Sequence, residues 1–336
     1  MNRIKKIVTR MNMQRFAETQ TTLLPGLSAE MKTYYEKRLI DLAEPELVHN
    51  QFGDKYPIPK GEGKTIEFRK YDSLPKALTP LTEGVTPAGN RLNVTTITAQ
   101  VDQYGDFIEM SDMLDLTAID NNLVQATHLL GNQAGRTLDT VTREVLAGGT
   151  NVLFCPKADG TEVTNRADLD KTCLLNRKTI FRAAAILKGM NAQKIDGSYV
   201  AIIHPYVSND VMSAEGWVDV QKYKNPEAVY EGEIGKLGGI RFVESSEAKI
   251  WKDDSCPEGM AVFSTLVIAA HAYGTTEIEG GGLQHIVKQL GYGNDPLNQR
   301  SSAGWKATAV AERLVEQYML RIESVSEMNA AVTAAN

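Results

Sequence analysis

Hydrophobic and polar residues alternate in two runs, residues 64–71 and 91–110. In the first run, Ile66 and Phe68 alternate with charged residues, and in the second, Leu92 and Val94 begin an alternating face that Val101 breaks. Such period-two patterns, rich in Thr, Val, Ile and aromatic residues, predict strands. The stretch between the runs has three prolines, two glycines and no periodicity, which indicates an open loop. Residues 64–110 therefore predict a long hairpin with an irregular tip.

A two-stranded hairpin of this kind is marginally stable alone and exposes two unpaired edges. We therefore expect it to rest on another surface, for which a neighbouring copy of the same chain is the natural candidate. A chain organised around a projecting arm is usually built for assembly.

Helical spacing of apolar residues predicts three helices. The first follows the N-cap Ser28 and ends before Pro45. The second, Asn121–Ala147, is the most regular element, and at 1.5 Å per residue it is roughly 40 Å long. The third covers about Lys171–Met190. The stripe predicted to face inward on the second helix consists of Leu123, Thr127, Leu130, Ala134, Leu138, Val141 and Val145.

The second half of the chain mixes strands and helices. Ser198–His204 is a continuous apolar run typical of a strand buried on both faces, and Pro205 begins a helix. Further strands are predicted within residues 240–245 and 259–274. Residues 283–293 and 302–325 fit either a helix or a strand, and the alternation around Trp305 favours strands. This order of elements predicts an α+β fold.

Composition and charge argue against several classes of protein. A chain of 336 residues with 42% hydrophobic content can bury a large core. Its net charge of −6 argues against a dedicated nucleic-acid-binding surface, although it leaves room for a local basic patch. Cys155, Cys173 and Cys256 lie too far apart for a metal or disulfide motif, which favours reduced thiols in a cytoplasmic setting. No run is apolar enough for a membrane span, so no membrane partner is expected.

Two glycine-rich segments resemble nucleotide-binding loops only superficially. Gly61–Thr65 reads GEGKT, but it leads into a strand, whereas a phosphate loop opens a helix. Gly232–Gly239 reads GEIGKLGG, which is not GxGxxG and precedes a strand. Turns explain both segments better, so no cofactor is expected.

Candidate catalytic and metal-binding residues are scattered. The carboxylate pairs Asp253–Asp254 and Glu277/Glu279 lie on polar, turn-rich stretches, and the basic and aromatic residues near Lys222 favour a solvated loop over a nucleic-acid site. No GxSxG or HExxH motif occurs. We therefore expect no catalytic, cofactor or metal residues and no enzymatic activity. The histidines and the basic and aromatic residues weighed here are His49, His128, His204, His271, His285, Lys222, Tyr223, Lys224 and Tyr230.

The order of elements, together with four short motifs, resembles the major capsid proteins of tailed phages, which have the Hong Kong 97-type fold. The motifs are MNMQRFA from Met11, YVAIIHP from Tyr199, GEIGKLGGIRFVES from Gly232 and GWK from Gly304. The resemblance covers about residues 11–324.

The resemblance implies a six-part organisation. It comprises an N-terminal arm (1–53), an extended hairpin loop (54–110), a peripheral domain (111–196) with the spine helix 121–147, an axial domain (197–282), return strands of the peripheral domain (283–325) and a flexible tail (326–336).

The resemblance also implies a function: self-assembly as pentamers and hexamers into an icosahedral shell enclosing packaged double-stranded DNA. The expected location is the virion, with assembly in the host bacterial cytoplasm. A separate scaffolding protein, a portal and decoration proteins are the implied partners, while DNA is contacted only non-specifically. Some relatives cross-link a hairpin lysine, for which Lys76 is the candidate here, but no matching asparagine signature is seen. An encapsulin-like cargo compartment and a soluble α+β enzyme are the alternatives.

Overall fold

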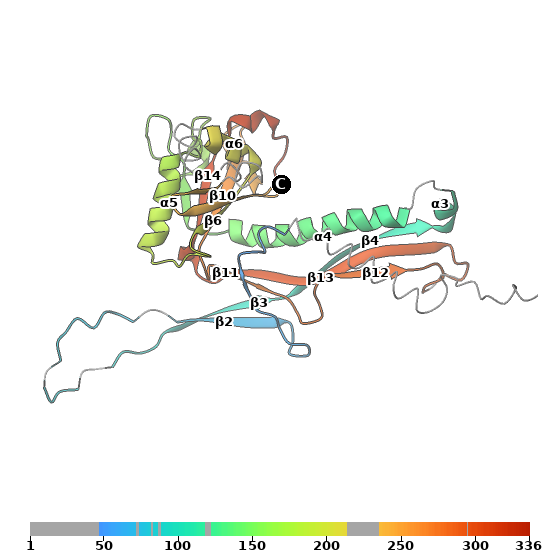
Figure 1. Ribbon diagram of the computed structural model, residues 1–336, viewed down its shortest axis with the longest axis horizontal. Coiled ribbons are helices and arrows are strands. Elements are labelled where there is room, and N and C mark those ends of the chain that lie inside the picture. The colour runs from blue at the N-terminus through green and yellow to red at the C-terminus, as the bar shows by residue number, and fades with distance from the viewer. Residues whose placement is uncertain are drawn as a thin grey trace, which may run out of the picture.

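A computed structural model describes residues 47–71, 74–81, 83–86, 89–117, 122–213, 235–293 and 295–336. The helix expected between Ser28 and Pro45 lies outside these ranges. Figure 1 shows a body built on one sheet, a long helix that runs away from this body along a second sheet, and a thin ribbon that projects below. The structure confirms the α+β class.

The long helix α4 (Asn122–Ala147) confirms the predicted spine. Leu130, Ala134 and Leu138 are buried as expected. Toward its C-terminal end the buried face turns: Val141 and Val145 are only half-buried, while Arg143 is buried. The cause is a contact on that side, where the Arg143 guanidinium donates to the Glu247 carbonyl at 2.7 Å.

One five-stranded sheet supports α4 along its length. The order is β1-β11-β13-β12, and β4 also pairs β13, over Arg300–Ala309. Leu130, Ala134 and Leu138 of α4 pack against Ala303 and Trp305 of β13. The strands predicted near the C-terminal end of the chain are thus confirmed. Their bounds are β1 (Asp54–Lys55), β4 (Asp102–Ser111), β11 (Tyr273–Thr276), β12 (Gln284–Lys288) and β13 (Arg300–Arg313).

The predicted hairpin is wrong beyond Gln100. β2 (Thr65–Tyr71) and β3 (Val94–Gln100) form the two-stranded ribbon, but β4 leaves it and pairs with β13 from Asp102 onward. The change occurs at Val101, the residue that broke the alternation; it is buried, and its N–H donates to the Lys64 carbonyl at 2.8 Å. Tyr104 and Ile108 of β4 then pack beneath α4. A short helix, α3 (Asp112–Thr117), follows β4.

A seven-stranded sheet forms the body. Its order is β5-β14-β10-β6-β8-β7, with β9 pairing β10. Every residue of β6 is buried, which confirms the strand predicted there. The bounds are β5 (Val152–Phe154), β6 (Tyr199–Ile203), β7 (Lys236–Leu237), β8 (Ile240–Glu244), β9 (Ile250–Trp251), β10 (Val262–Ile268) and β14 (Met319–Ser324).

Two helices cover this sheet. α6 (Pro205–Ser213) starts at the predicted proline. α5 (Arg177–Gly189) starts six residues later than predicted, because the Asn176 side chain caps it by accepting from the Thr179 N–H at 2.9 Å. Three short 3₁₀ helices complete the described elements: η2 (Arg166–Asp168), η4 (Glu316–Tyr318) and η5 (Glu327–Ala331).

The hydrophobic cores group the elements differently from the six-part scheme. α5 and β14, which the scheme gave to the peripheral domain, share one core with β6 and β10 of the axial domain. The segment 326–336, expected as a flexible tail, instead lies against β9: Val332 is buried, and the Asn336 side chain accepts from the Ile250 N–H at 2.8 Å. The boundaries of the scheme stay a prediction.

Candidate functional site

Among the described residues, the projecting ribbon contacts the rest of the chain at its base. β2 and β3 pair from Thr65 opposite Gln100 to Tyr71 opposite Val94. Phe68, half-buried, lies with its ring 5.3 Å from that of Tyr56 and packs close to β11. Beyond Phe68, every side chain of the paired strands is exposed except that of Lys70, which is half-buried. The ribbon is therefore held by the residue pairs nearest the body and extends away from it.

Large hydrophobic side chains gather on the ribbon and its tip. Leu78 is 82% exposed and Leu81 77%. A monomeric protein rarely leaves so many large apolar side chains in water on one projecting segment, so this set indicates a contact surface. We call this set the tip surface; it consists of Tyr71, Leu74, Leu78, Leu81, Val85, Leu92 and Val94.

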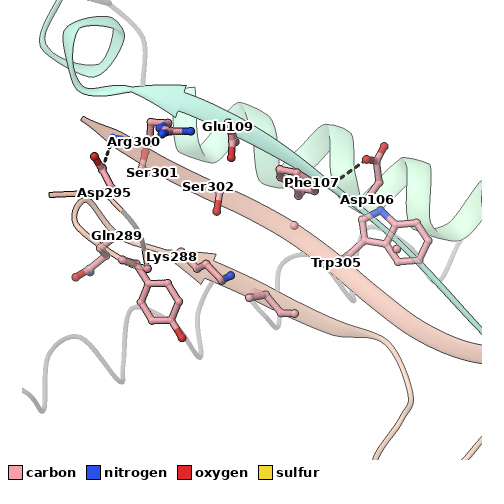
Figure 2. A pocket seen from close by; sticks show the side chains of 15 residues that line it. Asp106, Phe107, Glu109, Lys288, Gln289, Asp295, Arg300, Ser301, Ser302 and Trp305 are labelled. Atoms are coloured by element: carbon pink, nitrogen blue, oxygen red, sulfur yellow. Dashed lines mark hydrogen bonds between the residues drawn. The ribbon is translucent and has the colours of Figure 1, made fainter. Parts of the chain in front are cut away.

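A second contact surface lies at the far end of the five-stranded sheet. A groove of about 820 Å³ runs beside β12 and β13, and Figure 2 shows Lys288 and Gln289 on one side of it and Ser302 and Trp305 on the other. Exposed apolar side chains surround this end: Phe107, Met113, Leu114, Ile286, Leu290, Tyr292 and Leu297.

Hydrogen bonds hold the side chains that line the groove, but the described polar groups do not form a catalytic arrangement. The Gln133 amide of α4 donates to the Asp106 carboxylate at 2.6 Å and accepts from the Trp305 indole N–H at 3.2 Å. The Gln133 amide and the Phe107 N–H together hold the pKa of Asp106 below its usual range. Asp106 therefore stays an anion that ties β4 to α4. This arrangement suits contact rather than acid–base chemistry.

A buried polar cluster attaches the segment around His49, which precedes the ribbon, to α4. The Asp139 carboxylate accepts from the His49 N–H and pairs with its Nδ1, each at 2.6 Å, and both residues are fully buried. The Tyr273 hydroxyl donates to the His49 carbonyl, and its burial raises the pKa of the phenol. Gly53 lies so close to the Tyr273 ring that a Cβ there would be 2.5 Å from it.

Arginines from outside α4 cap its C-terminal end. The last turn of α4 has no basic residue of its own. Arg313 donates to the Val145 carbonyl at 2.7 Å, and Arg321 donates to those of Ala147 and Gly149. These cations satisfy the free carbonyls and oppose the negative end of the helix dipole.

Buried Glu323 balances this positive charge. It accepts from Arg166 through both carboxylate oxygens, at 2.7 and 2.8 Å, and from Arg321 at 2.9 Å. The hydrogen bonds that Arg166 donates to Glu323 raise the pKa of Arg166, whereas burial lowers that of Arg321. The cluster joins α4 to the body sheet and is structural.

The glycine-rich segments are turns wherever the structure describes them. Gly61 and Gly63 have φ near +94° and +93°, and β2 rather than a helix begins at Thr65. In the other segment, Gly232–Glu233–Ile234 lies outside the described residues. Gly238 and Gly239, at φ +63° and +89°, form the turn between β7 and β8. The interpretation of these segments as turns is confirmed for the described residues.

The candidate histidines and cysteines do not converge. His49 and His204 are buried, His128 and His271 are exposed, and His285 is half-buried. The three cysteines are buried as free thiols, and burial raises the pKa of each. Among the described residues, no group of three metal-ligating side chains comes together.

The carboxylate pairs lie on exposed turns, as expected. Asp253 accepts from Ser255, which lowers its pKa, and Glu277 and Glu279 are exposed. Lys76 is exposed at the tip of the ribbon. The stretch from Lys222 to Tyr230 lies outside the described residues. Over the described ranges, no helix is both long and apolar enough to cross a bilayer.

The sequence interpretation missed the buried polar clusters. Asp139 and Arg143 are four residues apart within the apolar pattern of α4, and this is the only signal they give. Their partners lie about 90 to 105 residues away in sequence. No local pattern predicts such pairs.

Comparison with protein families decides the class. Residues 98–277, more than half of the chain, match the model of a family described as phage capsid protein. The chain belongs to this phage capsid protein family. The expectation of a phage major capsid protein is therefore confirmed, and with it that of a structural protein of the viral capsid.

Solved capsids have the same fold at low sequence identity. The capsid of cyanophage P-SCSP1u is 15% identical, with a TM-score of 0.63 over 82% of this chain and 87% of that one. The capsid of Ralstonia phage GP4 is 15% identical, with a TM-score of 0.61 over 83% and 88%. That of Helicobacter pylori bacteriophage KHP30 is 10% identical, with a TM-score of 0.57 over 81% and 88%. Among curated proteins, none matches this chain.

Proposed function

We propose that this chain assembles into the closed icosahedral shell of a tailed phage, with a Hong Kong 97-type fold, around double-stranded DNA. The tip surface carries the proposal, because apolar side chains as exposed as Leu78 and Leu81 require a partner. Every copy carries the same surface, so a second copy is the partner that closed symmetry provides.

The shape supports many contacts per subunit. α4 and the five-stranded sheet, which carries the groove, extend to one side of the body, whereas the β2–β3 ribbon projects below it toward the other side (Figure 1). Each contact can be modest, since a subunit held by several neighbours in a closed shell gains from multivalency. Pentamers and hexamers of this chain are the proposed capsomers.

The partners follow from the same proposal. A separate scaffolding protein guides closure, a portal occupies one vertex, and decoration proteins bind the outer surface. Assembly takes place in the host bacterial cytoplasm, and the virion is the final location. Covalent cross-linking through Lys76 is not part of the proposal.

Deletion of residues 73–89 tests this function. The deletion removes the tip but keeps the paired strands β2 and β3 and the body. We expect the variant to stay soluble as subunits or capsomers, while the parent chain forms closed particles in negative-stain microscopy. Circular dichroism of both proteins checks that α4 and the sheets are intact.

The outcomes distinguish the proposed shell from the two alternative functions. Normal shells from the deletion variant would show that the tip is not the assembly element. A parent chain that stays a small oligomer under all assembly conditions would overturn the shell itself and favour a soluble enzyme. Parent shells that hold a protein cargo and no nucleic acid would favour an encapsulin-like compartment.

A further inference from the structure

The stretch from Lys171 to Lys194 has an unusual charge. It holds six Lys and Arg residues and no Asp or Glu, although the whole chain has 42 acidic residues in 336 and a net charge of −6. At that average, a stretch of 24 residues would hold three acidic residues. The stretch is thus positively charged, whereas the whole chain is negatively charged.

The fold places these cations on one face. α5 buries Ile180, Ala183, Ala184 and Leu187 against the body sheet. Its opposite face exposes Arg177, Lys178, Phe181, Arg182 and Lys188. Figure 1 shows α5 at the margin of the body, on the side away from α4. The cationic face therefore points outward from the body.

Neighbouring segments extend this face. A Cβ on Gly238 would be 3.0 Å from the Phe181 ring, and one on Gly239 would be 3.8 Å from Lys194 Nζ. The β7–β8 turn thus lies beside α5 and adds the exposed Lys236. We call this surface the basic face; it consists of Arg177, Lys178, Arg182, Lys188, Lys194 and Lys236 around Phe181.

Among the described residues, most of these cations have no acidic partner. Within the described part of the chain, only Arg182 forms an ion pair, with Glu162 at 2.7 Å. Both side chains of this pair are about half exposed or more, and such surface pairs contribute little. Arg177 lies over the Phe181 ring at 5.4 Å, which orients its guanidinium without neutralising it. The basic face keeps its positive charge available.

We propose that the basic face binds the phosphate backbone of a nucleic-acid duplex. The inference rests on the proposed function, in which the shell encloses duplex DNA. α5 is about 20 Å long, and a duplex carries one charge per roughly 1.7 Å of its axis, so several phosphates lie within reach of one helix face. Lysines bind phosphates as point charges without reading bases, so the contact is independent of sequence.

Charge and composition favour a nucleic acid over an acidic protein. The core of a protein interface is depleted in lysine and built around buried aromatic and aliphatic side chains. Phe181 on the basic face and Met190 at its edge are each 43% exposed, but six cations outnumber these two apolar side chains, and four of the cations are lysines. A partner that supplies dense, regular negative charge fits this surface best.

The test compares two triple variants of the full chain before assembly. K178Q/K188Q/K194Q removes three cations of the basic face and spares the Arg177–Phe181 and Arg182–Glu162 contacts. K60Q/K64Q/K288Q removes three exposed lysines elsewhere, so both variants have the same net charge. Fluorescence anisotropy measures binding of a labelled duplex of mixed sequence, about 30 bp long, between roughly 50 and 200 mM salt.

We expect the control variant to bind like the parent, and the basic-face variant to bind about tenfold or more weakly at about 100 mM salt. The slope of log affinity against log salt should fall in magnitude by about 2 to 3, or near 0.9 for each phosphate that the variant no longer neutralises. Equal weakening in both variants, or no binding by the parent, would overturn the proposal. So would poly-glutamate displacing the duplex at equal charge concentration, since the partner would then be an acidic protein.

The two proposals fail separately. Particle formation is scored by microscopy, and duplex binding is scored on unassembled protein. If the chain forms normal shells but does not bind the duplex, the proposal for the basic face is wrong and the proposed shell function stands. If the chain binds the duplex but never forms closed shells, the proposed shell function is wrong and the basic face still binds nucleic acid.

Discussion

At the scale of single residues, burial sets the charge of His204. Its Nδ1 accepts from the Tyr206 N–H at 3.1 Å, and its ring packs 4.8 Å from that of Tyr206 and 5.2 Å from that of Phe263. Burial lowers the pKa of His204 to about 4, against a smaller opposing effect of Glu247. The folded state therefore holds this imidazole neutral at pH values where the unfolded chain protonates it.

Acid should destabilise the fold through this residue. Stability from neutral His204 is fully present above pH 6.5 and is lost as pH falls from 6.5 toward 4, because protons bind the unfolded chain first. We expect a loss of about 2 kcal/mol between about pH 7 and 4.5. His204→Asn, which keeps an acceptor for the Tyr206 N–H, should flatten this dependence in urea unfolding. An unchanged pH slope in the variant would contradict the assignment.

Gly304 allows the close pairing of β13 with β4. A Cβ at this position would meet the Asp106 carbonyl at 2.8 Å and the Phe107 Cβ at 2.7 Å. Gly304→Ala should therefore lower the free energy of unfolding by about 1–3 kcal/mol. Gly189, at the end of α5 with open space around it, is the matched control, and Gly189→Ala should be neutral or stabilising by up to about 1 kcal/mol. Urea unfolding midpoints of the two variants decide the comparison; equal midpoints would refute the steric account.

At the scale of elements, buried polar contacts join segments that are distant in sequence. Asp139 holds His49 against α4, and Arg313 and Arg321 cap the end of the same helix from β13 and β14. These contacts fix α4 between its sheet and the body at both the middle and the end.

Asp139→Ala tests this role. The change leaves two buried His49 groups without their acceptor, and we expect the free energy of unfolding to fall by about 2–4 kcal/mol. Glu162→Gln, which weakens the exposed pair with Arg182, should cost less than about 1 kcal/mol. Helical circular dichroism during urea unfolding measures both. Equal costs would mean that the cluster adds no stability beyond a surface pair.

Local patterns predict elements better than they predict partners. Helical spacing located α4 to within one residue, and the apolar run at β6 was clear because both faces of that strand are buried. The break at Val101 was visible in the sequence, but the pairing of β4 with β13 depends on strands some 200 residues apart. The cations around α5 were not singled out from the sequence, and their gathering on one face with Lys194 required the fold.

At the scale of the whole molecule, the chain exposes apolar surface far from its cores. The tip surface and the far end of the five-stranded sheet both carry exposed large hydrophobic side chains, while buried polar contacts hold the middle and the C-terminal end of α4. A single copy is thus incomplete in the way that an assembly subunit is.

Polar substitution at the tip should weaken assembly without unfolding. Leu78→Asn/Leu81→Asn removes two of the most exposed apolar side chains, so the unfolding midpoint should stay unchanged. Particle yield in sedimentation should fall at least about tenfold if these side chains are buried between copies. Met190→Asn/Met328→Asn, with two exposed methionines on the body, is the control and should assemble normally. Equal yields from both variants would remove the tip surface from the assembly contacts.

Cryo-electron microscopy of particles formed by the unmodified chain tests the central claim most directly. The account predicts closed particles in which residues 65–100 of each copy lie across an adjacent copy, with Leu78 and Leu81 covered. Particles in which this ribbon folds back onto its own subunit would contradict it.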